Sequence, residues 1–196
     1  MEMKIIKLEE EWDLAFETAK KVLLSDGLLI YPTDTLYGIG GNALKKEVVD
    51  RIRRIKGREG EKPMSVAVGG LSMLLSFFYL KEEELGYITR YLPGPYTFLL
   101  RAKKPMPVSK GLVGVRVPAH FFVMKMINEV GFPIVSTSAN FSGEPAPSSV
   151  EEIKKEFLEK ADLVVDGGPT KYKEGSTVVD LVNKKILRKG AGEFEF

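Results

Sequence analysis

Residues 119–166 read AHFFVMKMINEVGFPIVSTSANFSGEPAPSSVEEIKKEFLEKADLVVD. Apolar side chains recur at helical spacing over 119–130 and 150–160, and as short runs typical of buried strands over 133–137 and 163–166. Helices that alternate with short apolar strands are typical of α/β folds, in which the helices cover a sheet. This stretch therefore predicts an α/β fold.

The same alternation extends over the rest of the chain. We expect further helices over 12–23, 44–55, 71–78 and 81–92, and strands over 3–8, 27–31, 64–68, 96–102, 113–117, 177–182 and 185–189. The last two strands are expected to form a hairpin, with Asn183 and Lys184 as its tight turn. A terminal hairpin added to alternating strands and helices predicts a mixed parallel and antiparallel sheet with flanking helices. At 196 residues we expect a single domain, covering residues 1–196.

The composition excludes several kinds of chemistry. The chain has no cysteine and a single histidine, His120, so disulfides, thiolate nucleophiles and multi-histidine metal sites are ruled out. An enzyme with this composition must work with hydroxyl groups, carboxylates, lysine and arginine. No apolar run approaches the roughly 18 residues of a membrane span, and the amino terminus lacks the layout of a signal peptide. We therefore expect a cytoplasmic protein without membrane contact.

A first polar cluster, YPTDTLYG at residues 31–38, follows a predicted buried strand. Because the proline extends the chain, the hydroxyls of Thr33 and Thr35 can point the same way, beside the phenol of Tyr37. A turn in which Asp34 hydrogen-bonds its own backbone accounts for the same residues. The cluster is thus either a binding site at a strand end or a turn.

A second cluster is basic and consists of Lys56, Gly57 and Arg58, with Lys62 just beyond. In extended chain Lys56 and Arg58 share a side, and Gly57 lets a ligand approach the backbone. An ammonium group beside a planar guanidinium is a usual way to hold phosphates. The alternative is the solvated basic end of helix 44–55, although a glycine there interrupts the helix.

The sequence STSAN at residues 136–140 forms a third cluster after a short apolar run. Ser136, Ser138 and Asn140 can line one side, while backbone N–H groups of the loop remain available to an anion. Short polar residues of this kind also form turns and helix caps. The cluster is therefore a candidate site or a local cap.

Isolated polar residues complete the set of candidates. Arg116 lies in an otherwise apolar predicted strand, so it should meet an anion, either a substrate carboxylate or an internal aspartate. His120, at a predicted helix start, is more often a cap or core residue than a catalyst. Ser176 and Thr177 add a hydroxyl pair near the carboxyl terminus, and Arg188 adds a cation. Neither the phosphate loop nor the dinucleotide fingerprint of the common nucleotide-binding folds is present.

Seven short motifs, in order from Tyr31 to Gly190, resemble those of the YrdC-like family, the threonylcarbamoyl-AMP synthases. They are YPTDTxYG, KGR, PGPxT, GxRxP, SxSANxSG, STVxD and RxG. The resemblance implies a YrdC-like domain in its short form, with a concave basic face on a twisted mixed sheet. It also implies that L-threonine, bicarbonate and ATP react to give threonylcarbamoyl-AMP and pyrophosphate. The product would pass to a threonylcarbamoyl-transferase complex that modifies transfer RNA.

The resemblance also implies roles for individual residues. The catalytic and nucleotide-binding set would be Lys56, Arg58, Ser138 and Asn140, and the ATP site would further include Lys62 and Arg188. Threonine would be held by Thr33, Thr35, Tyr37, Arg116, Ser136 and Ser176. Arg116 would bind its carboxylate. Mg²⁺ would arrive with ATP, because no metal cage of protein ligands is visible in the sequence.

Three positions depart from the family pattern. Glu59 stands where many members have proline, Lys62 where some have asparagine, and Ala67 where longer members have histidine. These departures bear on the contacts to threonine on that side of the site.

Other functions compete with the synthase. One is a non-catalytic module that binds double-stranded or transfer RNA through the same basic face, although residues 51–62 contain no aromatic side chain for base stacking. Another is a carbamoyl-transferring relative that assembles hydrogenase metal centres, and a third is an inactive α/β domain. If Lys56 and Arg58 face a ligand, replacing either by alanine should abolish turnover with little effect on thermal stability.

Overall fold

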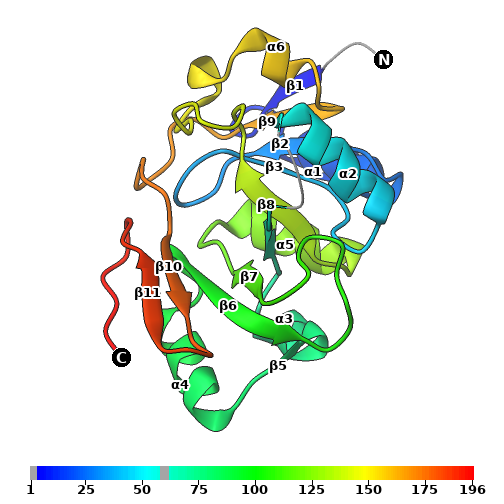
Figure 1. Cartoon of the computed structure of the whole chain (residues 1–196). Helices are drawn as coiled ribbons and strands as arrows, with labels where there is room; N and C mark the ends of the chain where they lie inside the picture. The colour runs from blue at the N-terminus through cyan, green and yellow to red at the C-terminus, as the bar shows by residue number, and fades with distance from the viewer. Residues whose placement is uncertain (1–3, 58–61) are drawn as a thin grey trace.

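The computed structural model describes residues 4–57 and 62–196 and has the predicted α/β fold (Figure 1). Its strands are β1 (Lys4–Lys7), β2 (Leu29–Tyr31), β3 (Gly38–Gly40), β4 (Ser65–Ala67), β5 (Phe78–Tyr79), β6 (Tyr96–Ala102), β7 (Val113–Arg116), β8 (Ile134–Ser138), β9 (Leu163–Asp166), β10 (Thr177–Asp180) and β11 (Lys185–Arg188). Its helices are α1 (Trp12–Leu24), α2 (Lys46–Ile55), α3 (Leu71–Phe77), α4 (Glu82–Tyr91), α5 (Phe121–Val130) and α6 (Lys155–Leu158), with a 3₁₀ turn, η1, at Val150–Glu152.

The strands form one mixed sheet in the order β1-β9-β2-β3-β8-β4-β7-β6-β10-β11, and β5 pairs with β6. The pairs β1–β9, β2–β9, β4–β7 and β6–β10 are parallel, and the remaining neighbours are antiparallel. The prediction of a mixed sheet is therefore confirmed. The hairpin β10–β11 pairs with β6, so the last strands of the chain join its middle.

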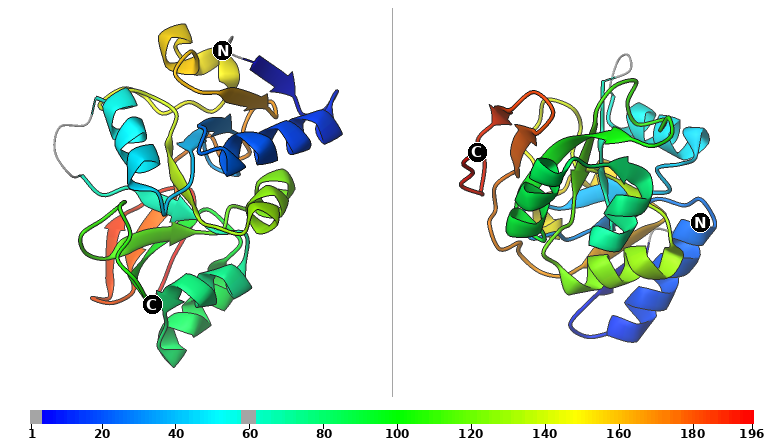
Figure 2. Two further views of the ribbon diagram at one scale, coloured as in Figure 1. Left: turned by 90° about the vertical axis from the view of Figure 1, so that its right-hand side faces the viewer. Right: turned by 90° about the horizontal axis from the view of Figure 1, so that it is seen from below.

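Apolar side chains pack on both faces of the sheet, because successive residues of a strand point to opposite faces. Leu29 and Tyr31 pack with α1 and α5, whereas Ile30 between them packs with α2. Figure 2 shows α1 and α5 side by side, in agreement with their direct contact. Both faces of the central strands are thus buried, so most polar side chains of these strands lie at or near their ends. None of the helices in the described part of the chain has the length and apolar character that a membrane crossing requires.

The short strand β3 was not predicted, because two of its three residues are glycine. A Cβ atom at Gly40 would lie 2.3 Å from the carbonyl oxygen of Val135 and 3.0 Å from the ring of Tyr31. Only glycine lets β3 lie this close to β8 while the Tyr31 ring packs against it. The glycines of β3 thus allow a strand to form at a position where the sequence pattern indicates a loop.

The single helix expected over residues 150–160 is wrong. The structure divides it into η1 and α6, with extended backbone at Ile153 and Lys154 between them. The carboxylate of Glu152 accepts hydrogen bonds from the backbone N–H of Ser148, at 2.6 Å, and from its hydroxyl. These contacts stabilise a tight turn, and the extended residue Ile153 buries its side chain in the core.

Candidate functional site

Polar side chains from distant parts of the chain line a cavity of about 230 Å³. Eight residues proposed from the sequence line it: Thr33, Thr35, Tyr37, Arg116, Ser136, Ser138, Ser176 and Arg188. Ser65 and Thr97 also line it, and sequence reasoning assigned them no role. Thr97 lies in the PGPxT motif, so that motif was the signal that could have identified it.

The register of the sheet brings these residues together. Pairing of β3 with β8 puts Gly38 opposite Ser138, and pairing of β4 with β8 puts Ser65 opposite Ser136. Gly38 and Ser65 begin their strands and Ser138 ends β8, whereas Ser136 lies in the middle of β8. The carboxyl ends of strands are where open α/β sheets place ligands. The cavity is therefore a product of the sheet topology, not of one loop.

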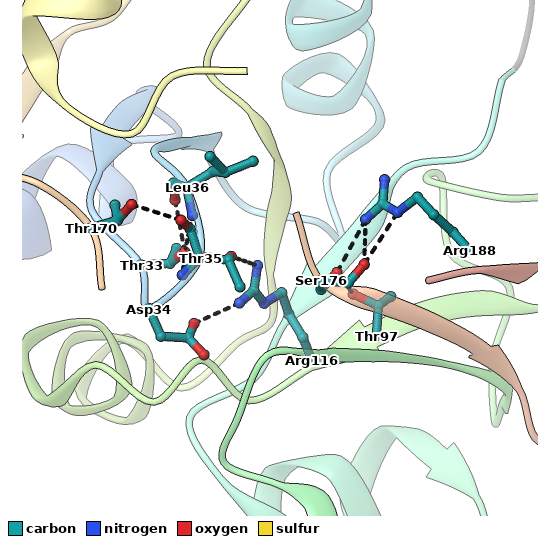
Figure 3. Close-up of polar contacts among 9 residues, drawn as sticks. All are labelled: Thr33, Asp34, Thr35, Leu36, Thr97, Arg116, Thr170, Ser176 and Arg188. Carbon is teal, nitrogen blue, oxygen red and sulfur yellow. Dashed lines mark hydrogen bonds and ion pairs between the residues drawn. The ribbon is translucent and has the colours of Figure 1, made fainter. Parts of the chain in front are cut away.

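The turn after β2 is held by the hydroxyl of Thr33. Its Oγ1 accepts hydrogen bonds from the backbone N–H groups of Thr35, at 3.1 Å, and Leu36, at 3.2 Å, and donates to the Leu36 carbonyl at 2.7 Å. The Thr33 and Thr35 hydroxyls lie 3.0 Å apart, as predicted, and Thr170 donates to the Thr35 carbonyl (Figure 3). The prediction of a turn is correct in kind, but Thr33 closes it and not Asp34.

Arg116 is 8% exposed and has an internal partner. Its Nη2 lies 2.6 Å from Oδ1 of Asp34, and its Nη1 donates to the Thr35 hydroxyl at 2.9 Å. The charge in the strand is therefore neutralised by an aspartate of the protein. Since Arg116 also lines the cavity, a ligand carboxylate can still reach the same guanidinium.

The hairpin β10–β11 supplies the opposite wall. Arg188 donates from Nη2 and Nε to the carbonyl of Ser176, at 2.7 and 3.1 Å, and the hydroxyls of Ser176 and Thr97 lie 2.8 Å apart (Figure 3). Burial lowers the pKa of Arg188, the positive charge of Arg116 lowers it further, and Glu174 opposes both. Two guanidinium groups near one another favour an anionic ligand in this cavity.

The structure brings Lys56 close to Ser138 and Asn140. The sequence did not reveal which atoms of these residues are in contact. The buried Lys56 donates from Nζ to the carbonyl of Ser138 at 2.5 Å, and to the carbonyl and side-chain oxygens of Asn140 at 2.8 and 3.4 Å. The Asn140 side chain lines a separate cavity of about 280 Å³. The ammonium group thus binds the loop after β8.

Further positions that the sequence singled out differ in their surroundings. The hydroxyl of Tyr37 donates to the carbonyl of Gly168 at 2.8 Å, and burial raises its pKa. Lys62 is exposed and does not line the cavity. Arg58 and Glu59 lie outside the described residues.

A larger hollow of about 1090 Å³ lies beside α2 and the loop that follows β6. Arg53 borders it and donates to the Pro107 carbonyl at 2.9 Å, so this arginine holds the loop in place. Of the sequence-predicted site residues that the structure describes, none lines this hollow.

Known proteins share both the sequence and the fold. The family model for Sua5, YciO and YrdC proteins, described as telomere recombination, matches residues 21–190. A putative threonylcarbamoyl-AMP synthase of Methanocaldococcus jannaschii is 38% identical over 191 residues, which cover 94% of this chain and 90% of the relative. The threonylcarbamoyl-AMP synthase of Pyrococcus abyssi is 35% identical over 188 residues, 92% of this chain and 55% of that protein. The crystal structure of P. abyssi Sua5 complexed with L-threonine has a TM-score of 0.87 at 31% identity, covering 97% of this chain and 58% of the other. The chain thus spans nearly all of the first relative and little more than half of the P. abyssi protein.

Proposed function

Because the chain belongs to the Sua5, YciO and YrdC family, we propose that it is a threonylcarbamoyl-AMP synthase that acts on L-threonine, bicarbonate and ATP. The observation that carries this proposal is the cavity in which Arg116 and Arg188 meet the hydroxyl groups of Thr35, Ser136 and Ser176. Hydroxyls and guanidinium groups are donors suited to an amino acid carboxylate and to phosphates.

The reaction needs no thiol or imidazole from the protein. The threonine amine forms a bond to the carbon of bicarbonate, which loses water, and gives a carbamate. A carbamate oxygen then forms a bond to the α-phosphorus of ATP, and the bond from that phosphorus to the oxygen bridging to the β-phosphorus breaks. Pyrophosphate leaves. Both steps are catalysed chiefly by positioning the reactants and neutralising charge.

On the amino acid side, Arg116 binds the carboxylate of threonine. The Thr35 hydroxyl, which accepts from the Arg116 guanidinium, and the Ser176 hydroxyl, which accepts from Arg188, both line the cavity and bind the threonine there. Ser136, on the neighbouring strand β8, completes the polar wall. Thr33 supports the threonine side of the cavity by closing the turn after β2. Tyr37 connects this turn to the segment after β9 through its hydrogen bond to the Gly168 carbonyl.

On the nucleotide side, Arg188, Arg58 and Lys62 neutralise the phosphates, and ATP enters as its Mg²⁺ complex. Ser138 lines the cavity and binds the nucleotide directly, with Asn140 on the far side of the same loop. Lys56 contributes by fixing the Ser138 and Asn140 carbonyls, which sets the shape of the loop. The product passes to a transferase complex that modifies transfer RNA, in the cytoplasm.

The proposal is tested by incubating the protein with ATP, Mg²⁺, L-threonine and labelled bicarbonate. We expect pyrophosphate release that requires threonine, together with label in an adenylate product. Folded protein that releases no pyrophosphate in response to threonine would refute the synthase. Binding of transfer RNA without such release would favour the non-catalytic RNA-binding module instead.

A further inference from the structure

Asp34 is a buried acid beside the cavity to which the proposed reaction assigns no role. Its side chain is 1% exposed, and it does not line the cavity itself. Among the described residues, its Oδ2 is a buried atom without a hydrogen-bond partner, and so are Nε of Arg116 and Nδ1 of the nearby His120. A buried carboxylate with so few contacts is costly to the fold, and its contact with Arg116 offsets part of that cost.

That contact holds the guanidinium by one edge. Within the described part of the chain, the Asp34 carboxylate accepts one hydrogen bond, from Nη2 at 2.6 Å, and the hydroxyl of the adjacent Thr35 accepts one from Nη1 at 2.9 Å. An arginine has five N–H donors, so three are not used by these contacts. Figure 3 shows Asp34 and Thr35 on one side of the Arg116 guanidinium, and Ser176 with Arg188 on the other.

The acid itself is fixed by its backbone. The Asp34 carbonyl accepts a hydrogen bond from the backbone N–H of Tyr172 at 3.0 Å, and the neighbouring Thr33 hydroxyl closes the turn. Both groups that hold Arg116 therefore belong to one rigid turn. A charged side chain held in this way loses little further freedom when it binds a ligand.

On the premise of the proposed function, we propose that Asp34 is a positioning residue for recognition of the substrate carboxylate. It fixes one edge of the Arg116 guanidinium, so that the remaining donors meet the carboxylate of threonine. Asp34 acts through Arg116 and touches no reacting atom.

The test compares L-threonine with L-threoninamide, which has the same amine but no carboxylate. We expect Asp34→Ala to raise the KM for threonine about tenfold or more and to leave the KM for ATP within about twofold. The preference for threonine over threoninamide in kcat/KM should fall to the value found for Arg116→Ala. Asp34→Asn retains an oxygen that can accept from Nη2, so its preference should stay within about threefold of the unmodified protein.

Asp34→Leu is measured in parallel, because leucine fills the volume that alanine would leave. Asp50→Ala is the matched control, because Asp50 also pairs with an arginine, Arg53, at 3.2 Å, and neither residue lines the cavity. This variant should not change the preference for threonine over threoninamide. The inference is overturned if Asp34→Ala or Asp34→Leu keeps the full preference, or if Asp34→Asn loses it as completely as Arg116→Ala does. An unmodified protein without threonine-dependent pyrophosphate release would instead refute the proposed function.

Discussion

The buried contacts of Lys56 change the expected effect of Lys56→Ala on stability, which the sequence predicted to be small. The sequence suggested a cation that faces a ligand, whereas its buried ammonium group donates to three oxygens of Ser138 and Asn140. Each hydrogen bond from a charged group contributes about 1.5 to 3 kcal/mol, so Lys56→Ala should lower the free energy of unfolding by about 3 kcal/mol. Urea unfolding measures this. Lys155→Ala, at a side chain that is 84% exposed, is the control and should leave the midpoint unchanged. Equal midpoints for both variants would contradict the prediction.

His120 makes stability depend on pH. Burial lowers its pKa from the ordinary 6.5, and the negative charge of Asp34 opposes the shift. The unfolded chain therefore binds this proton at a higher pH than the folded protein does. The resulting stabilisation is fully present above about pH 6.5 and is lost as the pH falls through the lower folded-state value. Between about pH 7.5 and 5.5, the Tm of the unmodified protein should fall more than that of His120→Gln. Parallel curves would exclude the effect.

The residues of the site could be predicted from the sequence better than their contacts could. The sequence singled out hydroxyl-bearing residues and cations as candidates, and eight of these residues line the cavity. The partner of Arg116 could not be chosen, because an internal aspartate and a substrate carboxylate satisfy the same buried charge. The contact between Lys56 and the loop after β8 joins residues 82 positions apart, and no local pattern records it.

At the scale of elements, β3 depends on the absence of a side chain at Gly40. A Cβ atom there would lie 2.3 Å from the Val135 carbonyl, which belongs to β8 and cannot move away cheaply. We expect Gly40→Ala to lower the free energy of unfolding by about 3 kcal/mol or more. The control is Gly86→Ala in α4, where a Cβ atom would meet nothing within 4 Å. It should raise stability by about 0.5 to 1 kcal/mol. Chemical denaturation of both variants decides the matter, and a loss in both would argue against this account.

Elements with an amphipathic pattern or a continuous apolar run were predictable, because these patterns are local. The amphipathic helices α1, α2 and α5 and the apolar strands β2, β8 and β9 lie where the sequence indicated them. The elements β3, η1 and α6 could not be predicted, because β3 depends on close packing against β8, and the contacts of Glu152 stabilise the turn that separates η1 from α6. Tertiary contacts outweigh intrinsic preference at such positions.

At the scale of the whole molecule, the carboxyl-terminal segment contributes to the core. Phe194 is 8% exposed, and its ring lies 4.7 Å from that of Tyr91 in α4 and 5.7 Å from that of Phe98 in β6, measured between ring centres. We expect Phe194→Ala to lower the free energy of unfolding by about 3 kcal/mol. Phe121→Ala, at a ring that is 73% exposed, should have a much smaller effect. Thermal unfolding compares the two, and an equal shift in Tm would contradict this view of the segment.

The order of the strands has a consequence for how the protein is made. Among the strands of residues 4–57 and 62–196, β1 pairs only with β9, and β6 pairs with β10. While the chain emerges from a ribosome, β1 must wait for about 160 residues of further synthesis before its partner exists. The wall that carries Ser176 and Arg188 is made after the rest of the cavity lining. The cavity is thus complete only once residue 188 has been synthesised, and a nascent chain released before that point would lack one of its walls.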